Sequence, residues 1–80
     1  MDWHTYIDMD PQILQGKPVV RGTRLSVEFL LGLLGAGWTR DQVLASYPTL
    51  TADSLAAACT FASESLRDMS FYPLPSPPSP

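Results

Sequence analysis

The sequence predicts a mainly α fold in which a short N-terminal β arm precedes three helices. Apolar residues recur at helical spacing in three segments after residue 26. Each segment follows a Ser or Thr that can cap a helix, whereas short alternating or β-branched stretches occur before residue 22. A chain of 80 residues allows one domain, which we place at residues 1–72. Five of the eight prolines fall in residues 73–80, which predicts a disordered Pro-rich tail there.

The first predicted element is a short strand over residues 3–9, where side chains of opposite character alternate. A turn at Asp10-Pro11 follows. Residues 18–21 form a second extended segment because they contain two consecutive valines. Gly22 then permits a bend before the first helix. An isolated two-stranded hairpin is only marginally stable, so the arm could pair across a homodimer.

The first helix is predicted over residues 27–34, with Ser26 as its N-cap. Further apolar residues widen its surface beyond one stripe, which indicates more than one packing partner. The Gly35-Ala36-Gly37 run should end the helix, with a glycine in the left-handed conformation. Four side chains at i, i+3, i+4 and i+7 spacing form the stripe that we expect to be buried: Val27, Leu30, Leu31 and Leu34.

The second and third helices are predicted over residues 39–47 and 51–69. Thr39 and Gln42 match a capping box, and a proline ends the second helix. The third helix is rich in alanine and can approach a neighbour closely. Its stripe includes Cys59, the single cysteine, which we expect to be a small core residue. The two helices and their connecting turn have helix-turn-helix proportions.

Positive charge is concentrated before the first helix. Lys17, Arg21 and Arg24 are three of the five basic residues, and no acid occurs from residue 11 to 27, so this stretch carries a charge of +3. The whole chain has a net charge of −3. Such a cationic segment can meet phosphate or a carboxylate-rich protein surface. It can equally be a solvated turn whose arginine stems cover the edge of the core.

Several functions are disfavoured by what the sequence lacks. No phosphate-cradling glycine loop occurs, and no Ser or Cys has an obvious nearby base, so we expect neither an enzyme nor a cofactor. Asp8 and Asp10 alone would make a weak metal site, and we expect no metal. The longest apolar stretch, residues 27–38, is too short and broken to span a membrane. The N-terminus does not match a secretion signal, so we expect a cytoplasmic protein.

Two segments carry a family resemblance. Residues 16–27 read Gly-Lys-Pro-Val-Val-Arg-Gly-Thr-Arg-Leu-Ser-Val, and residues 47–51 read Tyr-Pro-Thr-Leu-Thr. Together with the order of helices, they resemble the small bacterial family catalogued as domain of unknown function four-three-three, over about residues 6–66. That family is similar to homeodomain-like helix-turn-helix proteins, and its members are viewed as antitoxins encoded beside small nucleases of the PIN type. The resemblance implies a homodimer that binds a toxin, DNA or both, and it carries over no catalytic residue.

The first functional hypothesis is an antitoxin that binds a PIN-type nuclease toxin. Such a nuclease holds its metal ions with several carboxylates, and an inserted arginine could pair with them bidentately and displace the metal. Arg21 and Arg24 lie on a glycine-flanked arm suited to this role. Lys17 would add electrostatic steering.

The second hypothesis is a DNA-binding repressor of its own operon. The first two turns of the third helix, residues 51–58, contain none of the Arg, Lys, Asn or Gln side chains that most often read bases. Binding to operator DNA would therefore depend on basic side chains and on hydroxyls that donate to phosphate. A third hypothesis is a homo-oligomeric scaffold in which Arg21 and Arg24 pair internally with Asp8 or Asp10. The candidate partner- or nucleic-acid-binding residues are Lys17, Arg21, Arg24, Arg40, Thr49, Thr51 and Ser54.

Overall fold

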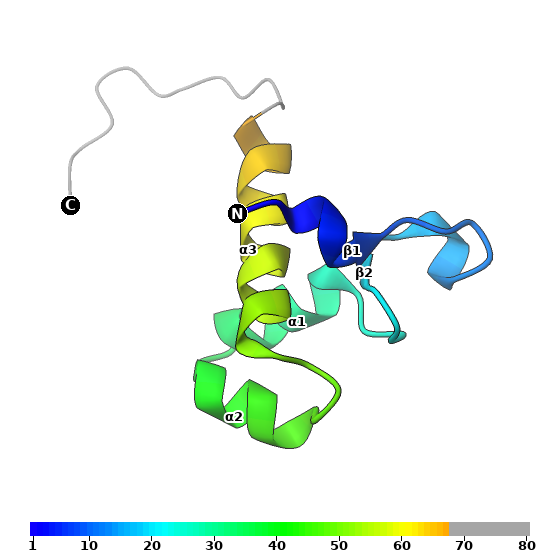
Figure 1. The fold of residues 1–80 in the computed structure, drawn as a ribbon. Helices are drawn as coiled ribbons and strands as arrows, with labels where there is room; N and C mark the ends of the chain where they lie inside the picture. Colours follow the sequence, from blue (N-terminus) through cyan, green and yellow to red (C-terminus); the bar gives the residue numbers. More distant parts are fainter. Residues whose placement is uncertain (68–80) are drawn as a thin grey trace, which may run out of the picture.

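A computed structural model describes residues 1–67 and has a two-stranded β arm followed by three helices (Figure 1). The predicted mainly α fold class is confirmed. The predicted domain end at residue 72, the tail over residues 73–80 and the end of the third helix at Met69 lie outside the described residues. The elements are the 3-10 turns η1 (Trp3–Thr5) and η2 (Leu14–Gly16), the strands β1 (Ile7–Asp8) and β2 (Val19–Val20), and the helices α1 (Val27–Gly35), α2 (Arg40–Ser46) and α3 (Ala52–Arg67).

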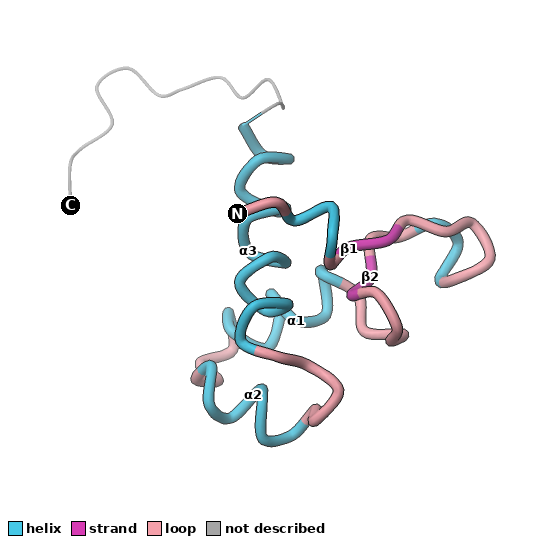
Figure 2. The backbone as a smooth tube through the Cα atoms, in the orientation of Figure 1, coloured by secondary structure: helices cyan, strands magenta, loops and turns pink. Residues whose placement is uncertain are grey.

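The β arm is an antiparallel pair that is tied directly to α1. Ile7 lies opposite Val20 in the register of β1 and β2. A further bridge joins Val19 to Ser26, and the Val27 N–H donates to the Pro18 carbonyl at 2.9 Å. The arm is therefore anchored at its base. The segment that connects β1 to β2 projects away from the helices (Figure 2).

The predicted strand over residues 3–9 is too long, because its first half forms η1. The Asp2 carboxylate caps this turn by accepting from the His4 N–H at 3.0 Å. A hydrogen bond with the His4 ring also lowers the pKa of Asp2 below its ordinary value. The Trp3 ring lies edge-on to Phe61 of α3 at 4.7 Å between centroids, and its Nε1 donates to Glu64 Oε1 at 3.2 Å. These contacts with α3 outweigh the local alternation of side chains.

The predicted caps at the start of α1 and α2 and the glycine after α1 are confirmed. The Ser26 side chain accepts from the Phe29 N–H at 2.9 Å, so it is the N-cap of α1. Thr39 and Gln42 form the complete capping box of α2, with reciprocal hydrogen bonds of 2.8 and 3.1 Å. Gly37, with φ of 99°, is the glycine that follows α1 in the left-handed region.

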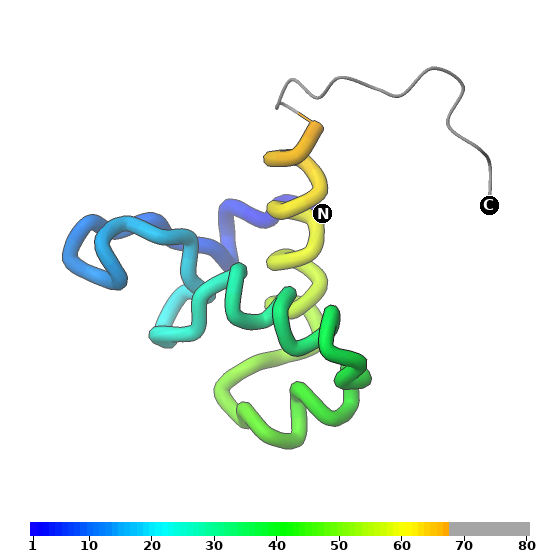
Figure 3. Tube along the Cα trace, turned by 180° about the vertical axis from the view of Figure 1, so that it is seen from behind, coloured from blue at the N-terminus to red at the C-terminus, as the bar shows by residue number. Residues whose placement is uncertain are grey.

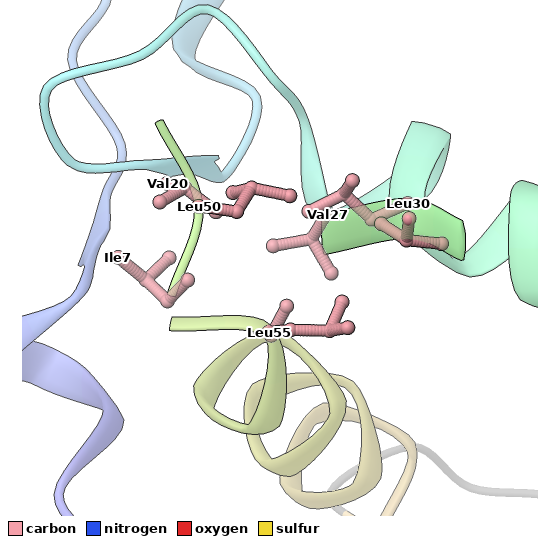
Figure 4. Close-up of a cluster of buried hydrophobic side chains, with 8 residues drawn as sticks. Ile7, Val20, Val27, Leu30, Leu50 and Leu55 are labelled. Atoms are coloured by element: carbon pink, nitrogen blue, oxygen red, sulfur yellow. The ribbon is translucent and has the colours of Figure 1, made fainter. Parts of the chain in front are cut away.

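The hydrophobic core lies between the β arm and the three helices (Figure 4). Leu31 and Leu34, which were expected to be buried with the rest of the α1 stripe, are only half-buried against this core. The prediction that Cys59 is a core residue is wrong, since it is exposed. Ala58 faces the core, and the next residue of a helix lies about 100° further round the axis. The buried cluster consists of Ile7, Val20, Val27, Leu30, Val43, Leu50, Leu55 and Ala58.

Candidate functional site

The β arm carries three cationic side chains on and beside β2. Lys17 lies two residues before the strand, Arg21 directly follows it, and Arg24 lies in the turn that leads to α1. All three residues are exposed. We call residues 17–24 the cationic arm.

Arg21 is held by the register of the sheet. Because Asp8 pairs with Val19 in the antiparallel ladder, Arg21, two residues after Val19, is a diagonal neighbour of Asp8 on the same face, and Arg21 Nη2 reaches Asp8 Oδ1 at 2.8 Å. Arg21 Nε donates to the same oxygen at 3.0 Å, and Nη2 also donates to the His4 carbonyl at 3.1 Å. The Arg21 and Asp8 side chains are 55% and 36% exposed. An ion pair this exposed contributes only about 0–1 kcal/mol to stability.

The other two cations are bound less firmly. Lys17 Nζ lies 3.3 Å from Glu28 Oε1 of α1, and both side chains are largely exposed. Arg24 forms no ion pair or side-chain hydrogen bond among residues 1–67. The scaffold hypothesis expects both arginines to pair internally with Asp8 or Asp10. The structure places Arg21 against Asp8 but leaves Arg24 open within the described part of the chain.

The fold gathers four of the predicted site residues around one cavity. This cavity has a volume of about 260 Å³ and lies between the β arm and the turn before α3. Sequence separation gave no indication of this convergence, because the β arm and that turn are about 30 residues apart. The lining residues are Thr5, Tyr6, Val20, Arg21, Thr49, Thr51 and Ser54.

The hydroxyls of this cavity differ in whether they are already engaged in hydrogen bonds with the protein. Ser54 is buried, and its Oγ accepts from the Thr51 N–H at 2.9 Å and donates to the Thr51 carbonyl at 3.0 Å. Thr51 Oγ1 accepts from the Ser54 N–H at 3.1 Å. Both side chains therefore serve first to cap α3. Thr49 is exposed, so its side chain is reachable by a ligand.

Arg40 does not join the cationic arm. It is the first residue of α2, and α1 runs away from the β arm, so α2 starts on the far side of the helices (Figure 3). Arg40 lines a separate cavity of about 280 Å³ with Leu34, Leu55, Ala56 and Cys59. A ligand that contacts the cationic arm would therefore have to span the helices to reach Arg40.

Two wider properties of residues 1–67 bear on the site. Among them, no three His, Cys, Asp or Glu side chains come close enough together to hold a metal ion. None of the helices in this part of the chain has the length and apolar character needed to cross a membrane.

Lys17 is the one candidate binding residue that the sequence analysis placed between β1 and β2, and the structure draws attention to the rest of that segment. Leu14 and Gln15 adopt left-handed φ values of 49° and 58°, and Leu14 and Met9 are exposed. The only local signal was Gly16, which also has a positive φ. A glycine in a turn does not reveal that its non-glycine neighbours share its conformation.

The family described as "Protein of unknown function (DUF433)" matches residues 7–62. The chain belongs to this family. The DUF433 match covers the cationic arm, α1, α2 and most of α3, and it confirms the family that the sequence resembles.

Two relatives extend this comparison. The chain is 36% identical over 56 residues to "Uncharacterized protein y4eO" of Sinorhizobium fredii, which covers 70% of this chain and 25% of that protein. It thus spans about a quarter of that relative's length. The crystal structure of a DUF433 member protein from Anabaena variabilis is similar with a TM-score of 0.73 and 31% identity, over 76% of this chain and 60% of that one. The helical arrangement described above is therefore one that a DUF433 protein adopts in a crystal.

Proposed function

We propose that this chain is an antitoxin-like protein that binds and neutralises a small nuclease of the PIN type. The observation that carries the proposal is the cationic arm, in which Arg24 is exposed and without an ion pair among residues 1–67. A nuclease that holds metal ions with several carboxylates is a complementary partner, because a guanidinium can pair with a carboxylate through two parallel hydrogen bonds. An arginine bound there would occupy the place of the metal.

The charge distribution supports a contact confined to the arm. The whole chain has a net charge of −3, so most of its surface would repel an acidic site. Arg21 could exchange Asp8 for a carboxylate of the partner at little cost, since the existing pair is exposed. Lys17 would add steering at longer range.

The proposal includes a homodimer in the cytoplasm. A chain of 80 residues buries a small core, and a second copy would add to its stability. Phe29 is a large exposed apolar residue on α1 and is available for such a contact.

A second candidate function is repression by operator DNA binding. It is favoured by the cavity that groups Arg21 with Thr49 of the turn before α3, because guanidinium and hydroxyl groups commonly contact the phosphates that position a protein on DNA. The exposed residues at the start of α3 include Ala52 and Asp53, which offer no base-reading donor. The Asp53 carboxylate would also repel phosphate. Partner binding is therefore the better supported of the two.

Co-expression with the product of the neighbouring gene tests the main proposal. We expect the two proteins to co-purify, and we expect ribonuclease activity of the partner to fall when this chain is added in equimolar amount. Excess Mg²⁺ or Mn²⁺ should partly restore activity, because the metal and the arginine compete for the same carboxylates. Absence of a complex, or RNA cleavage that is unaffected by this chain, would contradict the proposal.

Titration of the promoter DNA at several salt concentrations tests the second candidate. With Lys17, Arg21, Arg24 and Arg40 as the available contacts, the slope of log affinity against log salt should not exceed about −0.9 per cation, or roughly −3.6 for each chain. If the chain does not bind its promoter at any salt concentration, with or without the nuclease, the repressor function is excluded.

A further inference from the structure

We infer that residues 9–16, the arm tip, anchor this chain in its partner protein, with Leu14 filling an apolar pocket that is bordered by carboxylates. The inference rests on the proposed function, since it names the contact through which a protein partner would be held. It adds a hydrophobic anchor to the charge contacts of the cationic arm.

The first observation is the backbone of the arm tip. Leu14, Gln15 and Gly16 have φ values of 49°, 58° and 83°, so three consecutive residues are left-handed. Glycine adopts this conformation freely, but a leucine does so rarely because its Cβ meets the neighbouring carbonyl oxygen. The turn is closed by the Gly16 N–H on the Ile13 carbonyl at 3.0 Å and the Lys17 N–H on the Leu14 carbonyl at 3.2 Å. Disfavoured conformations that persist in a fold cluster at active sites, ligand clamps and switch regions, so the arm tip is a candidate contact site.

The second observation is that the turn does not bury its leucine. Leu14 is 40% exposed and Met9 is 53% exposed. The strands on either side send Ile7 and Val20 into the core cluster, to which no residue of the arm tip belongs. The arm tip projects from the body of the molecule in both views of the chain (Figures 1 and 3). A projecting turn that leaves 40% of a leucine exposed can place that side chain in a pocket of a partner.

The third observation is the charge beside the arm tip, which defines the partner. Lys17 directly follows the turn and is held only by an exposed pair with Glu28, whereas Arg24 lies beyond the opposite end of the β1–β2 ladder. The partner pocket should therefore have an apolar floor for Leu14 and carboxylates on the rim that faces Lys17. Duplex DNA offers phosphates but no pocket of this kind, which points to a protein.

Two matched substitutions separate the anchor from the strained backbone. Asn adopts the left-handed conformation more readily than Leu or Gln, so Leu14→Asn and Gln15→Asn should both raise the melting temperature of the free chain. Only Leu14→Asn removes the anchor. With the neighbouring-gene product as the probe, calorimetry should show Kd raised about 10- to 100-fold by Leu14→Asn, as expected for loss of a buried leucine. Gln15→Asn should change Kd by less than about threefold.

The possible outcomes distinguish this inference from the proposed function. If Leu14→Asn binds the nuclease as tightly as the wild type, the anchor is refuted and the antitoxin role stands. If the wild type does not bind the nuclease, both are refuted. If Leu14→Asn leaves the nuclease complex intact but disrupts self-association in sedimentation experiments, the occupant is a second copy of this chain and the inference is wrong. A lower melting temperature for Gln15→Asn would contradict the backbone argument.

Discussion

Replacement of Arg24 by alanine should separate partner binding from stability. Arg24 is exposed and forms no ion pair among residues 1–67, so Arg24→Ala should change the free energy of unfolding by less than about 0.5 kcal/mol. In a domain of this size that corresponds to a melting temperature within about 4 °C of the wild type. If the guanidinium pairs with a buried carboxylate of the nuclease, its removal should cost about 2 kcal/mol or more of binding free energy. This corresponds to a rise in Kd of about 30-fold.

Isothermal titration calorimetry with the neighbouring-gene product and thermal melting by circular dichroism measure the two quantities. Arg24→Lys is the matched control, because it keeps the charge but cannot make the bidentate contact. We expect Arg24→Lys to retain the association rate and to lose most of the same affinity through faster dissociation. A Kd for Arg24→Ala within twofold of the wild type would refute the reasoning. So would a large loss of melting temperature, because Arg24 would then have a structural role.

Three further predictions concern the fold. Leu30→Ala should cost about 3 kcal/mol of stability and about 12–24 °C in melting temperature, since Leu30 is fully buried. Leu66→Ala, at an exposed position of α3, should change the melting temperature little. If the two variants lose the same amount of stability, the core assignment is wrong. Thr39→Ala removes one half of the α2 capping box and should lower the free energy of unfolding by about 1 kcal/mol, as measured by urea titration. An unchanged midpoint of the urea transition would argue against the cap. Cys59 should react with a chromophoric disulfide in the native chain as fast as in urea, and strong protection would contradict its exposure.

The features that the sequence predicted correctly depend on neighbours in the chain. The Ser26 cap and the Thr39–Gln42 capping box each involve residues three apart, so the pattern contains the whole interaction. The charge of the cationic arm is likewise a property of consecutive residues. These features do not depend on how the helices pack against one another.

The features that the sequence missed depend on distant contacts or on orientation. η1 is stabilised by the hydrogen bond between Trp3 and Glu64, which are 61 residues apart. The exposure of Cys59 depends on the rotation of α3 about its axis, which its alanine-rich surface hardly specifies. The sequence allowed an internal pair of Arg21 with Asp8 or Asp10 but did not decide between them, because the choice of Asp8 follows from the strand register.

A helix-turn-helix arrangement does not by itself assign DNA binding to this chain, because function is decided by the side chains of a site. The hydroxyls of Thr51 and Ser54, which a DNA-binding account would direct at phosphates, hydrogen-bond each other's backbone at the start of α3. The Thr51 and Ser54 hydroxyls are thus largely engaged in capping α3. By contrast, Arg24 and Leu14 contribute no ion pair or core contact to the described fold, and Leu14 lies in a disfavoured conformation. The proposed partner contact therefore rests on Arg24 and Leu14, which are exposed side chains of the arm, and not on the hydroxyls that cap α3.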